Sequence, residues 1–337
     1  MSAAVLVTGG AGYIGSHTCK ALVAAGFLPV TYDNLSKGHR WAVRWGPLVE
    51  GDIHDRNRLA FTLHQYGIEA IVHFAAFAYV GESMREPGGY FANNVAGSLT
   101  LLEAAHAAGD PPVVFSSSCA TYGVPGHTPI AEAHPQLPCN PYGESKLFVE
   151  RALHWYGEAH AAPWVSLRYF NAAGADADGE TGEDHDPETH LIPLAIEAAL
   201  GLGPALQVFG TDYPTRDGTA VRDYIHVTDL AAAHVEALQH LRGGGHSLAL
   251  NLGTGQGHSV RQVVDTVSRV GGQPVPVVEA PRRAGDPPEL VADASRARAT
   301  LDWRPVHSDL DNIVETAWRW HSRQVDKLPE CQAAVAS

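Results

Sequence analysis

The chain has few basic residues for its length of 337 residues. It carries 23 lysines and arginines against 37 aspartates and glutamates, and its formal net charge is −14. Nucleic acid is therefore not an expected partner, because binding its phosphates requires a basic surface. The acidic balance still permits a small anionic ligand, since a few local N–H groups or arginines can bind one phosphate.

Cysteines and long apolar runs are also scarce. The four cysteines, Cys19, Cys119, Cys139 and Cys331, form no Cys-x-x-Cys pair, which argues against a disulfide scaffold and favours a reducing compartment. No apolar run reaches the roughly 18 residues of a membrane span, and no basic segment precedes an apolar one at the start. We therefore expect a cytoplasmic protein with no membrane partner.

What the chain does contain is an alternation of strand-like and helix-like segments in its first half. Hydrophobic residues make up 45% of the chain, as in folded globular proteins. Short apolar segments predict buried strands at Ala3–Val7, Leu28–Tyr32, Ala70–Phe74, Val113–Phe115 and Val165–Tyr169. Helical composition follows at Gly12–Ala25, Asp55–Tyr66, Asn94–Ala108 and Tyr142–His160. This order predicts an α/β fold with a doubly wound parallel sheet of the Rossmann type.

The second half of the chain has a different composition. Asn171–His190 is polar and predicts a long loop, Leu191–Leu200 has helical composition, and Arg222–Leu241 contains a strong helix. We expect a smaller C-terminal α/β domain that binds the substrate. The predicted domains are residues 1–170 plus about 222–252 for the cofactor, and 171–221 plus about 253–337 for the substrate.

A glycine motif lies between the first predicted strand and helix. Gly9, Gly12 and Gly15 have the spacing Gly-x-x-Gly-x-x-Gly. Glycines here permit a tight turn and the close approach of a pyrophosphate, while the helix N-terminus offers unpaired N–H groups. Such a trio alone can be only a turn, but its place between a strand and a helix indicates dinucleotide binding.

Acidic residues after the next strands favour NAD over NADP. Asp33 ends the second predicted strand, where a carboxylate can accept hydrogen bonds from the adenosine ribose and would repel a 2′-phosphate. Asp52 follows another predicted strand and is a candidate adenine contact. Either residue could instead be a turn aspartate.

A catalytic arrangement follows from Ser118, Tyr142 and Lys146. Tyr142 and Lys146 are four residues apart and so share one face of a predicted helix, while Ser118 ends a predicted strand. A free tyrosine has a pKa near 10, so Tyr142 can act as a base at neutral pH only if its pKa is lower than this. A nearby ammonium and a positive nicotinamide ring both favour the phenolate. Alone, Tyr-x-x-x-Lys is common on surface helices; beside the glycine motif it indicates catalysis.

These motifs together resemble the extended short-chain dehydrogenase/reductase family, and within it the nucleotide-sugar 4-epimerases. The resemblance covers nearly the whole chain. Besides the glycine motif, it rests on the following blocks: Tyr32-Asp33-Asn34-Leu35, Gly51-Asp52-Ile53, His73-Phe74-Ala75-Ala76, Gly81-Glu82-Ser83, Asn93-Asn94-Val95, Arg168-Tyr169-Phe170-Asn171, Val221-Arg222-Asp223-Tyr224-Ile225-His226 and Arg282-Arg283-Ala284-Gly285-Asp286.

The resemblance implies a role for each matching residue. Tyr142 is the base, Lys146 holds the nicotinamide ribose and tunes Tyr142, and Ser118 contacts the sugar. NAD contacts are implied for Gly9, Gly12, Tyr13, Ile14, Gly15, Asp33, Asn34, Asp52, Ile53, Phe74, Ala75, Ala76, Asn94, Tyr142, Lys146 and Phe170. Contacts to a UDP-sugar are implied for Ser118, Tyr142, Asn171, His190, Leu191, Arg222, Arg283 and Asp286. The two arginines suit a diphosphate, although a surface ion pair with a nearby aspartate would also explain them.

The implied reaction is reversible 4-epimerisation of a UDP-hexose, UDP-galactose to UDP-glucose, through a 4-keto sugar with tightly bound NAD. The resemblance also implies a homodimer through the helices Asn94–Ala108 and Gly143–His160. Ala78, His190 and Leu290 depart from the common pattern of the family, which leaves a UDP-arabinose/UDP-xylose or a UDP-N-acetylhexosamine 4-epimerase as alternatives.

More remote alternatives are a nucleotide-sugar 4,6-dehydratase and a catalytically silent NAD-binding regulator. A dehydratase commonly has an Asp-Glu pair after the serine, whereas Cys119-Ala120-Thr121 follows Ser118 here. No metal is expected. His185, Asp186, Glu188 and His190 could be ligands, but without cysteines or a helical i, i+4 pair the polar segment favours a solvated loop.

Overall fold

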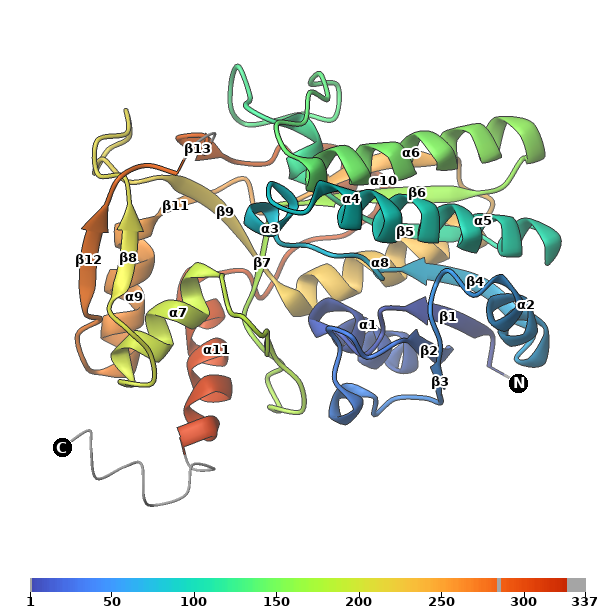
Figure 1. Cartoon of the computed structure of the whole chain (residues 1–337), viewed down its shortest axis with the longest axis horizontal. Helices are drawn as coiled ribbons and strands as arrows, with labels where there is room; N and C mark the ends of the chain where they lie inside the picture. The colour runs from blue at the N-terminus through green and yellow to red at the C-terminus, as the bar shows by residue number, and fades with distance from the viewer. Residues whose placement is uncertain (1, 284–285, 326–337) are drawn as a thin grey trace.

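The computed structural model describes residues 2–283 and 286–325, so Cys331 and the predicted Ala284-Gly285 block lie outside the described residues. Its main feature is a seven-stranded sheet, parallel throughout (Figure 1). Across the sheet the strands are β10 (Leu248–Leu252), β6 (Trp164–Tyr169), β5 (Val113–Ser118), β4 (Ile68–His73), β1 (Ala4–Thr8), β2 (Leu28–Asp33) and β3 (Leu48–Glu50). The predicted doubly wound parallel sheet is confirmed.

Helices cover both faces of this sheet, and each face has its own apolar core. On one face pack α1 (Tyr13–Ala24), α8 (Val227–Arg242) and α10 (Ser295–Leu301), with buried side chains such as Leu22, Leu230 and Leu301. On the other pack α2 (Arg56–Gln65), α5 (Gly97–Ala107) and α6 (Pro141–His160), with Leu59, Leu101 and Val149. Strands buried on both faces need apolar side chains at successive positions, which is why β1 reads Ala-Val-Leu-Val.

A smaller part of the chain lies beyond the carboxyl ends of the large sheet (Figure 1). Its four-stranded sheet contains β11 (Gly257–Ser259), β9 (Val221–His226) and β13 (Glu289–Leu290), and β7 (Asn171–Ala173) pairs with β9. A second pair is β12 (Val277–Ala280) with β8 (Leu206–Phe209). The helices α7 (Leu191–Ala199), α9 (Val260–Gly271) and α11 (Leu310–Val325) form a third apolar core.

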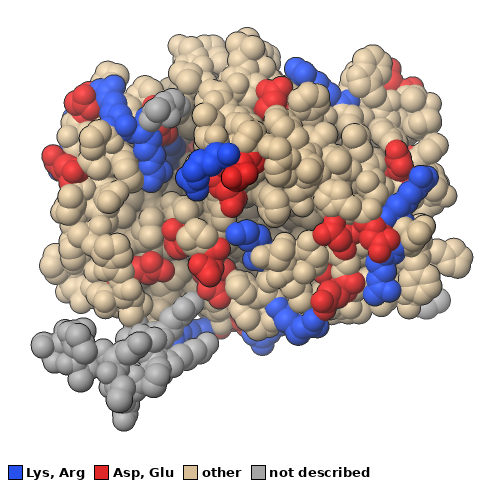
Figure 2. All heavy atoms as spheres, viewed as in Figure 1, with Lys and Arg blue, Asp and Glu red and all other residues tan. Residues whose placement is uncertain are grey.

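Short helical segments complete the fold. They are η1 (Arg40–Ala42), α3 (Val80–Ser83), α4 (Pro87–Tyr90), η2 (Phe91–Ala96) and η3 (Cys119–Tyr122). No helix in the described ranges has the length and apolarity that crossing a bilayer requires. On the face that Figure 2 shows, acidic and basic side chains are interspersed rather than separated.

The helix expected within Arg222–Leu241 is present as α8, which begins at Val227, after Arg222 on strand β9. Two other expectations about elements need correction. The segment Asn171–His190 is not loop throughout, because Asn171–Ala173 pairs with β9 as β7. The helix expected over Asn94–Ala108 starts as the π-helix η2, in which the Asn94 side chain bonds to Phe77 and Ser145.

Candidate active site

The glycine loop lies where the strand order of the sheet reverses. It joins β1 to α1, and β1 has β2 on one side and β4 on the other, which is the crevice where doubly wound sheets bind dinucleotides. Gly9 has φ of 71°, and a Cβ on Gly15 would lie 2.2 Å from the Gly9 carbonyl oxygen. Side chains are therefore excluded here, and the N-cap residue of α1, Gly12, makes no side-chain cap bond. The loop thus has the bare backbone that a pyrophosphate needs.

The Asp33 carboxylate forms a hydrogen bond to the glycine loop. Its Oδ2 accepts a hydrogen bond of 3.0 Å from the Ala11 N–H, and its Oδ1 accepts one of 2.8 Å from the Leu35 N–H. Burial raises the pKa of the Asp33 carboxyl, while these two bonds act in the opposite direction. Asp33 is thus a turn residue at the end of β2 and also holds the glycine loop.

The candidate adenine-side residues lie together at the ends of β2 and β3. Asn34 Nδ2 donates to Asp52 Oδ2 at 2.9 Å, and Asp52 Oδ1 accepts from the His54 N–H at 2.9 Å. Partial burial opposes ionisation of Asp52, but hydrogen bonds from His54 and Asn34 outweigh it and lower the pKa of Asp52. The neighbouring Ile53 is buried, and a Cβ on Gly97 would lie 2.5 Å from its Cδ1.

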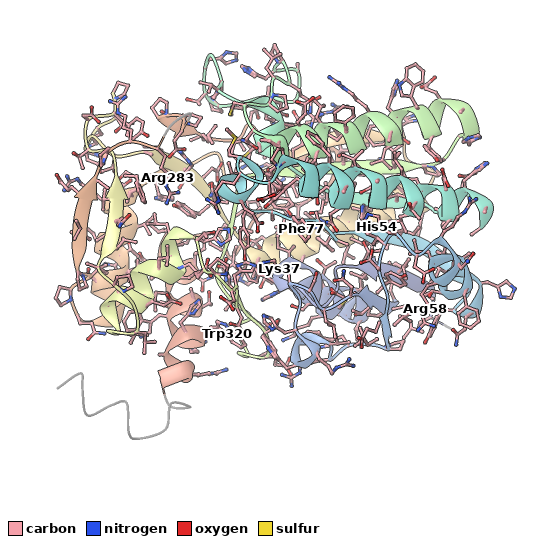
Figure 3. The ribbon with its side chains drawn as sticks, in the orientation of Figure 1. Lys37, His54, Arg58, Phe77, Arg283 and Trp320 are labelled. Atoms are coloured by element: carbon pink, nitrogen blue, oxygen red, sulfur yellow. The ribbon has the colours of Figure 1, made fainter. Side chains whose placement is uncertain are left out.

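The segment after β4 is tied to the glycine loop and to α6. The N–H groups of Phe74 and Ala75 donate to the Thr8 carbonyl, at 2.9 and 3.1 Å. Phe77, labelled in Figure 3, exchanges two hydrogen bonds with the Asn94 side chain, whose Nδ2 also donates to Ser145 Oγ at 3.0 Å. Asn94 therefore links the segment after β4, at Phe77, to Ser145 on α6.

Ser118, Tyr142 and Lys146 are buried side chains at the carboxyl end of β5 and the start of α6. Asn140 caps α6 by accepting from the Gly143 N–H at 2.8 Å, so Tyr142 lies in the first helical turn. Lys146 Nζ lies 5.8 Å from the centre of the Tyr142 ring and donates to the Ser116 carbonyl at 2.8 Å. The structure therefore brings together the three residues that the sequence predicts.

The electrostatics of this site differ from the expectation. Burial raises the pKa of Tyr142 well above its usual value, and a hydrogen bond with Ser118 opposes this only in part. Burial also lowers the pKa of Lys146 to about 7. The protein's own groups therefore keep Tyr142 as a phenol, and the expected phenolate depends on a further positive charge next to it.

One buried ion pair behind these residues was not predicted. Glu150 lies one turn after Lys146 on α6, and its Oε2 accepts from Arg168 Nη2 at 2.6 Å. Ser117 Oγ donates to Glu150 Oε1 at 2.5 Å, and Gln136 Nε2 donates to Oε2 at 3.0 Å. The spacing Tyr142, Lys146, Glu150 at i, i+4 and i+8 could have signalled this shared helix face.

The candidate substrate residues come mostly from the small sheet. Asn171 on β7, Arg222 on β9 and Leu290 on β13 lie on neighbouring strands, with Leu290 opposite Arg222. Arg222 forms an ion pair with Asp286, so these two residues are brought together. Arg283, at the upper left of Figure 3, instead lies over the Phe209 ring with its guanidinium carbon 4.0 Å from the ring centre. Leu191 begins α7.

The segment His185–His190 is a loop, as expected, but it is only partly solvated. The side chains of Glu183, His185, Glu188 and His190 gather there, and the glutamates are only 4% and 7% exposed. Burial opposes charge on these groups, but the glutamate charges raise the pKa of His185 to about 9 and that of His190 to about 10. The pKa of both glutamates is lowered in turn by the two histidines, against the effect of burial. Asp186, Pro187 and Thr189 are exposed.

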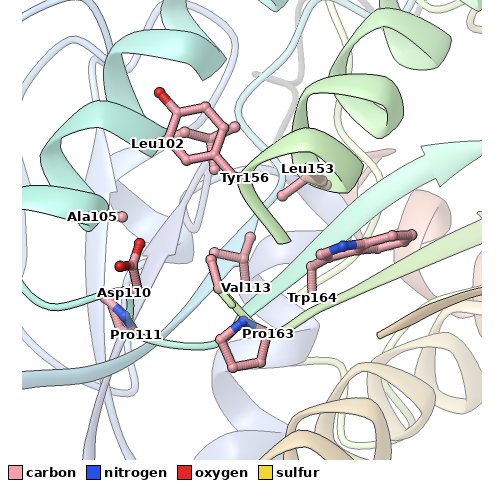
Figure 4. A pocket seen from close by; sticks show the side chains of 10 residues that line it. Leu102, Ala105, Asp110, Pro111, Val113, Leu153, Tyr156, Pro163 and Trp164 are labelled. Carbon is pink, nitrogen blue, oxygen red and sulfur yellow. The ribbon is translucent and has the colours of Figure 1, made fainter. Parts of the chain in front are cut away.

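A mostly apolar pocket lies elsewhere, between α5, α6 and the starts of β5 and β6 (Figure 4). Val113 and Trp164, the first residues of β5 and β6, line it, whereas Ser118 is the last residue of β5. It is therefore separate from Ser118, Tyr142 and Lys146.

Comparison with known proteins decides the family. Residues 5–253 match the profile of the NAD dependent epimerase/dehydratase family. A UDP-glucose 4-epimerase of Rhizobium meliloti (strain 1021) is 56% identical over 320 residues, covering 95% of this chain and 97% of that protein. The chain belongs to the NAD dependent epimerase/dehydratase family. NAD is accordingly its cofactor, as the glycine loop and Asp33 predict.

Solved structures agree with this assignment. The crystal structure of UDP-glucose 4-epimerase from Brucella ovis in complex with NAD has a TM-score of 0.93 at 55% identity, covering 94% of this chain and 98% of that one. A UDP-glucose-4-epimerase from Stenotrophomonas maltophila, with bound NAD and formylated UDP-arabinopyranose, has a TM-score of 0.94 at 43% identity, covering 97% and 100%. The resemblance stated from the sequence is confirmed, with the Rossmann fold that it implies.

Proposed function

We propose that this chain interconverts UDP-galactose and UDP-glucose by 4-epimerisation, as an isomerase that keeps NAD bound through the cycle. The observation that carries the proposal is the burial of Ser118, Tyr142 and Lys146 together, at the end of β5 next to the dinucleotide crevice. UDP-glucose 4-epimerases that match over nearly the full length support the substrate class.

The residues divide the work as follows. Tyr142 takes the proton of the sugar 4-hydroxyl and later returns it, and Ser118 hydrogen-bonds the same oxygen. Lys146 donates a hydrogen bond to the Ser116 carbonyl and holds the nicotinamide ribose, and its protonated form adds positive charge beside Tyr142. Bound NAD supplies the hydride acceptor and donor, and its positive ring favours the phenolate. UDP anchors the substrate so that the 4-keto sugar can present either face.

The cofactor contacts form the first part of the proposed site. The backbone of the Gly9–Gly15 loop would hold the pyrophosphate, together with Tyr13 and Ile14 at the start of α1. Asp33 with Asn34, and Asp52 with Ile53, hold the adenosine end. The other residues that would contact NAD are Phe74, Ala75, Ala76, Asn94, Tyr142, Lys146 and Phe170, with Lys146 at the nicotinamide ribose.

The substrate contacts form the second part. Arg222 and Arg283 bind the diphosphate, and the Asp286 carboxylate orients Arg222 through the ion pair present in the structure. Asn171, His190 and Leu191 contact the UDP-sugar from β7 and the start of α7. The division into residues 1–170 plus about 222–252 for NAD and the remainder for the UDP-sugar is part of this proposal; α8 packs on the large sheet beside α1, and β10 is a strand of that sheet.

We also propose a cytoplasmic homodimer that pairs through α5 and α6. Four exposed apolar side chains on or next to these helices support the interface: Phe91, Leu99, Phe148 and Trp155. Phe91 and Phe148 contact each other edge to face, with ring centres 6.3 Å apart. Burying such a patch against a second copy removes it from water.

A substrate panel tests the function. Purified protein, without added NAD, should convert UDP-galactose faster than UDP-arabinose or UDP-N-acetylgalactosamine, and nuclear magnetic resonance identifies each 4-epimer. Preference for the pentose or the acetamido sugar would support the corresponding alternative. Dehydrated products, or bound NAD with no turnover of any sugar, would refute the proposal.

A further inference from the structure

Two glutamates and two histidines converge in the segment between β7 and α7. We name Glu183, His185, Glu188 and His190 the His/Glu cluster; one ligand atom of each lies within 4.8 Å of those of the other three. His190 Nδ1 lies 2.8 Å from Glu183 Oε1 and 2.9 Å from Glu188 Oε1. His185 Nδ1 lies 3.1 Å from Glu183 Oε1 and 3.7 Å from Glu188 Oε2.

The geometry within the cluster points to a shared central atom. His185 Nδ1 is buried and makes no hydrogen bond, although a carboxylate oxygen lies 3.1 Å away. With metal–ligand bonds near 2.0–2.2 Å, the donor atoms of a tetrahedral zinc site lie about 3.3 Å apart. The four His–Glu separations, from 2.8 to 3.7 Å, lie on both sides of that value, with Glu188 facing His190 through Oε1 and His185 through Oε2.

Surrounding groups hold the ligands in place. Glu188 Oε1 accepts from the N–H groups of Thr189 and His190, at 2.6 and 2.8 Å. Trp320 of α11, labelled in Figure 3, donates its indole N–H to the Glu183 carbonyl at 2.8 Å. The ring of Tyr79 lies edge-on to His185, with ring centres 6.0 Å apart. Metal ligands are typically oriented by such outer hydrogen bonds and packing.

A nearby acidic cluster differs from the His/Glu cluster because a lysine neutralises part of its negative charge. Asp176, Asp178 and Glu180 also lie close together, but Lys20 Nζ contacts all three carboxylates at 2.8–2.9 Å. Its charge is therefore already partly balanced by an ammonium. In the His/Glu cluster the negative charge of the two glutamates is balanced either by two protonated imidazoles or by a bound cation.

We propose that the His/Glu cluster binds one Zn²⁺ ion through Glu183, His185, Glu188 and His190. Two imidazole nitrogens with two carboxylate oxygens are a donor set that zinc accepts, whereas magnesium and calcium prefer oxygen ligands in larger number. Four protein ligands leave no open position, so the site is structural. It fixes the segment that passes Tyr13 of the glycine loop and leads to His190 and Leu191 at the start of α7. His190 faces the cluster through Nδ1, so the UDP-sugar contact proposed above falls to its Nε2.

The first experiment measures zinc directly. The full-length protein is stripped with chelator, reloaded with zinc chloride, freed of excess metal and analysed by mass spectrometry of the metal. One zinc per chain is expected for the wild type and for Asp178→Asn, which alters the neighbouring acidic group. Glu188→Gln and His185→Gln should each retain less than about a tenth of the zinc. A stripped wild type that takes up no zinc, or variants that bind it like the wild type, would overturn the proposal.

A second experiment avoids the variants. Anomalous diffraction at the zinc edge, from crystals of the zinc-loaded wild type, should place one peak within bonding distance of all four side chains. Zinc should also raise the thermal unfolding temperature in a saturable way. A zinc peak only at other surface groups would show that the cluster binds no metal and that its histidines are protonated instead. The proposal would then fail, whether or not the protein is an active epimerase.

Discussion

Removing the negative charge of Glu150 should strongly destabilise the fold. Its carboxylate accepts from Arg168, Ser117 and Gln136, and the side chains of Glu150 and Arg168 are only 6% and 7% exposed. In Glu150→Gln one oxygen becomes an NH₂ group, which faces donors and leaves the guanidinium without a counter-charge. Breaking a buried ion pair from one side costs about 3–5 kcal/mol. We therefore expect the free energy of unfolding to fall by about that amount.

Urea denaturation followed by circular dichroism measures this change. The matched control is Glu158→Gln on the same helix, where the side chain is exposed; its effect should stay within about 0.5 kcal/mol. Replacing both partners with leucine should cost less than replacing either one alone, because no buried charge is then left unpaired. If Glu150→Gln is no more destabilising than Glu158→Gln, the pair does not support the fold as argued.

Three further predictions concern the cofactor, the substrate and acid. Gly15→Ala should weaken NAD binding by at least about tenfold, or 1.4 kcal/mol, because the new Cβ would lie 2.2 Å from the Gly9 oxygen. The control Gly88→Ala, where the new Cβ meets open space, should bind NAD like the wild type in the same titration. A Gly15→Ala protein that binds NAD as tightly as the Gly88→Ala control would contradict the role of the glycine loop. Arg222→Met should raise KM for the UDP-sugar while bound NAD stays constant, and an unchanged KM would remove Arg222 from the substrate site. Acid should destabilise the protein, because burial lowers the pKa of four histidines to about 3–4 from 6.5: His17, His73, His226 and His234. Their contribution to the free energy of unfolding is complete above pH 6.5 and is lost as the pH falls towards 3–4. By pH 5.5 each histidine should have lost about 1.4 kcal/mol of this contribution. Equal urea midpoints at pH 7.5 and pH 5.5 would refute this prediction.

The sequence predicts the large sheet well because its strands are continuous apolar segments and its helices begin and end at recognisable residues. Gly12, just before α1, and Asn140, at the N-cap of α6, are local signals of this kind. Ser118, Tyr142 and Lys146 were found because their spacing places them on adjacent elements of that regular fold.

The small sheet could not be predicted in the same way. β7 and β13 have three and two residues, and each exists through pairing with β9, far away in sequence. The sequence offered His185, Glu188 and His190 as possible ligands but favoured a solvated loop, and it did not indicate Glu183. A polar composition indicates solvent, but Tyr13, Tyr79 and Trp320 from distant parts of the chain cover this segment.

Turnover of UDP-galactose by Tyr142→Phe tests the central claim most directly. Because the substitution removes only the phenolic oxygen, the variant should retain bound NAD and affinity for UDP, while kcat falls by about 10²–10⁴-fold. Tyr156→Phe, further along α6, serves as the control and should keep normal turnover. A Tyr142→Phe protein that epimerises UDP-galactose at a near wild-type rate would contradict the assignment of Tyr142 as the proton-transferring group.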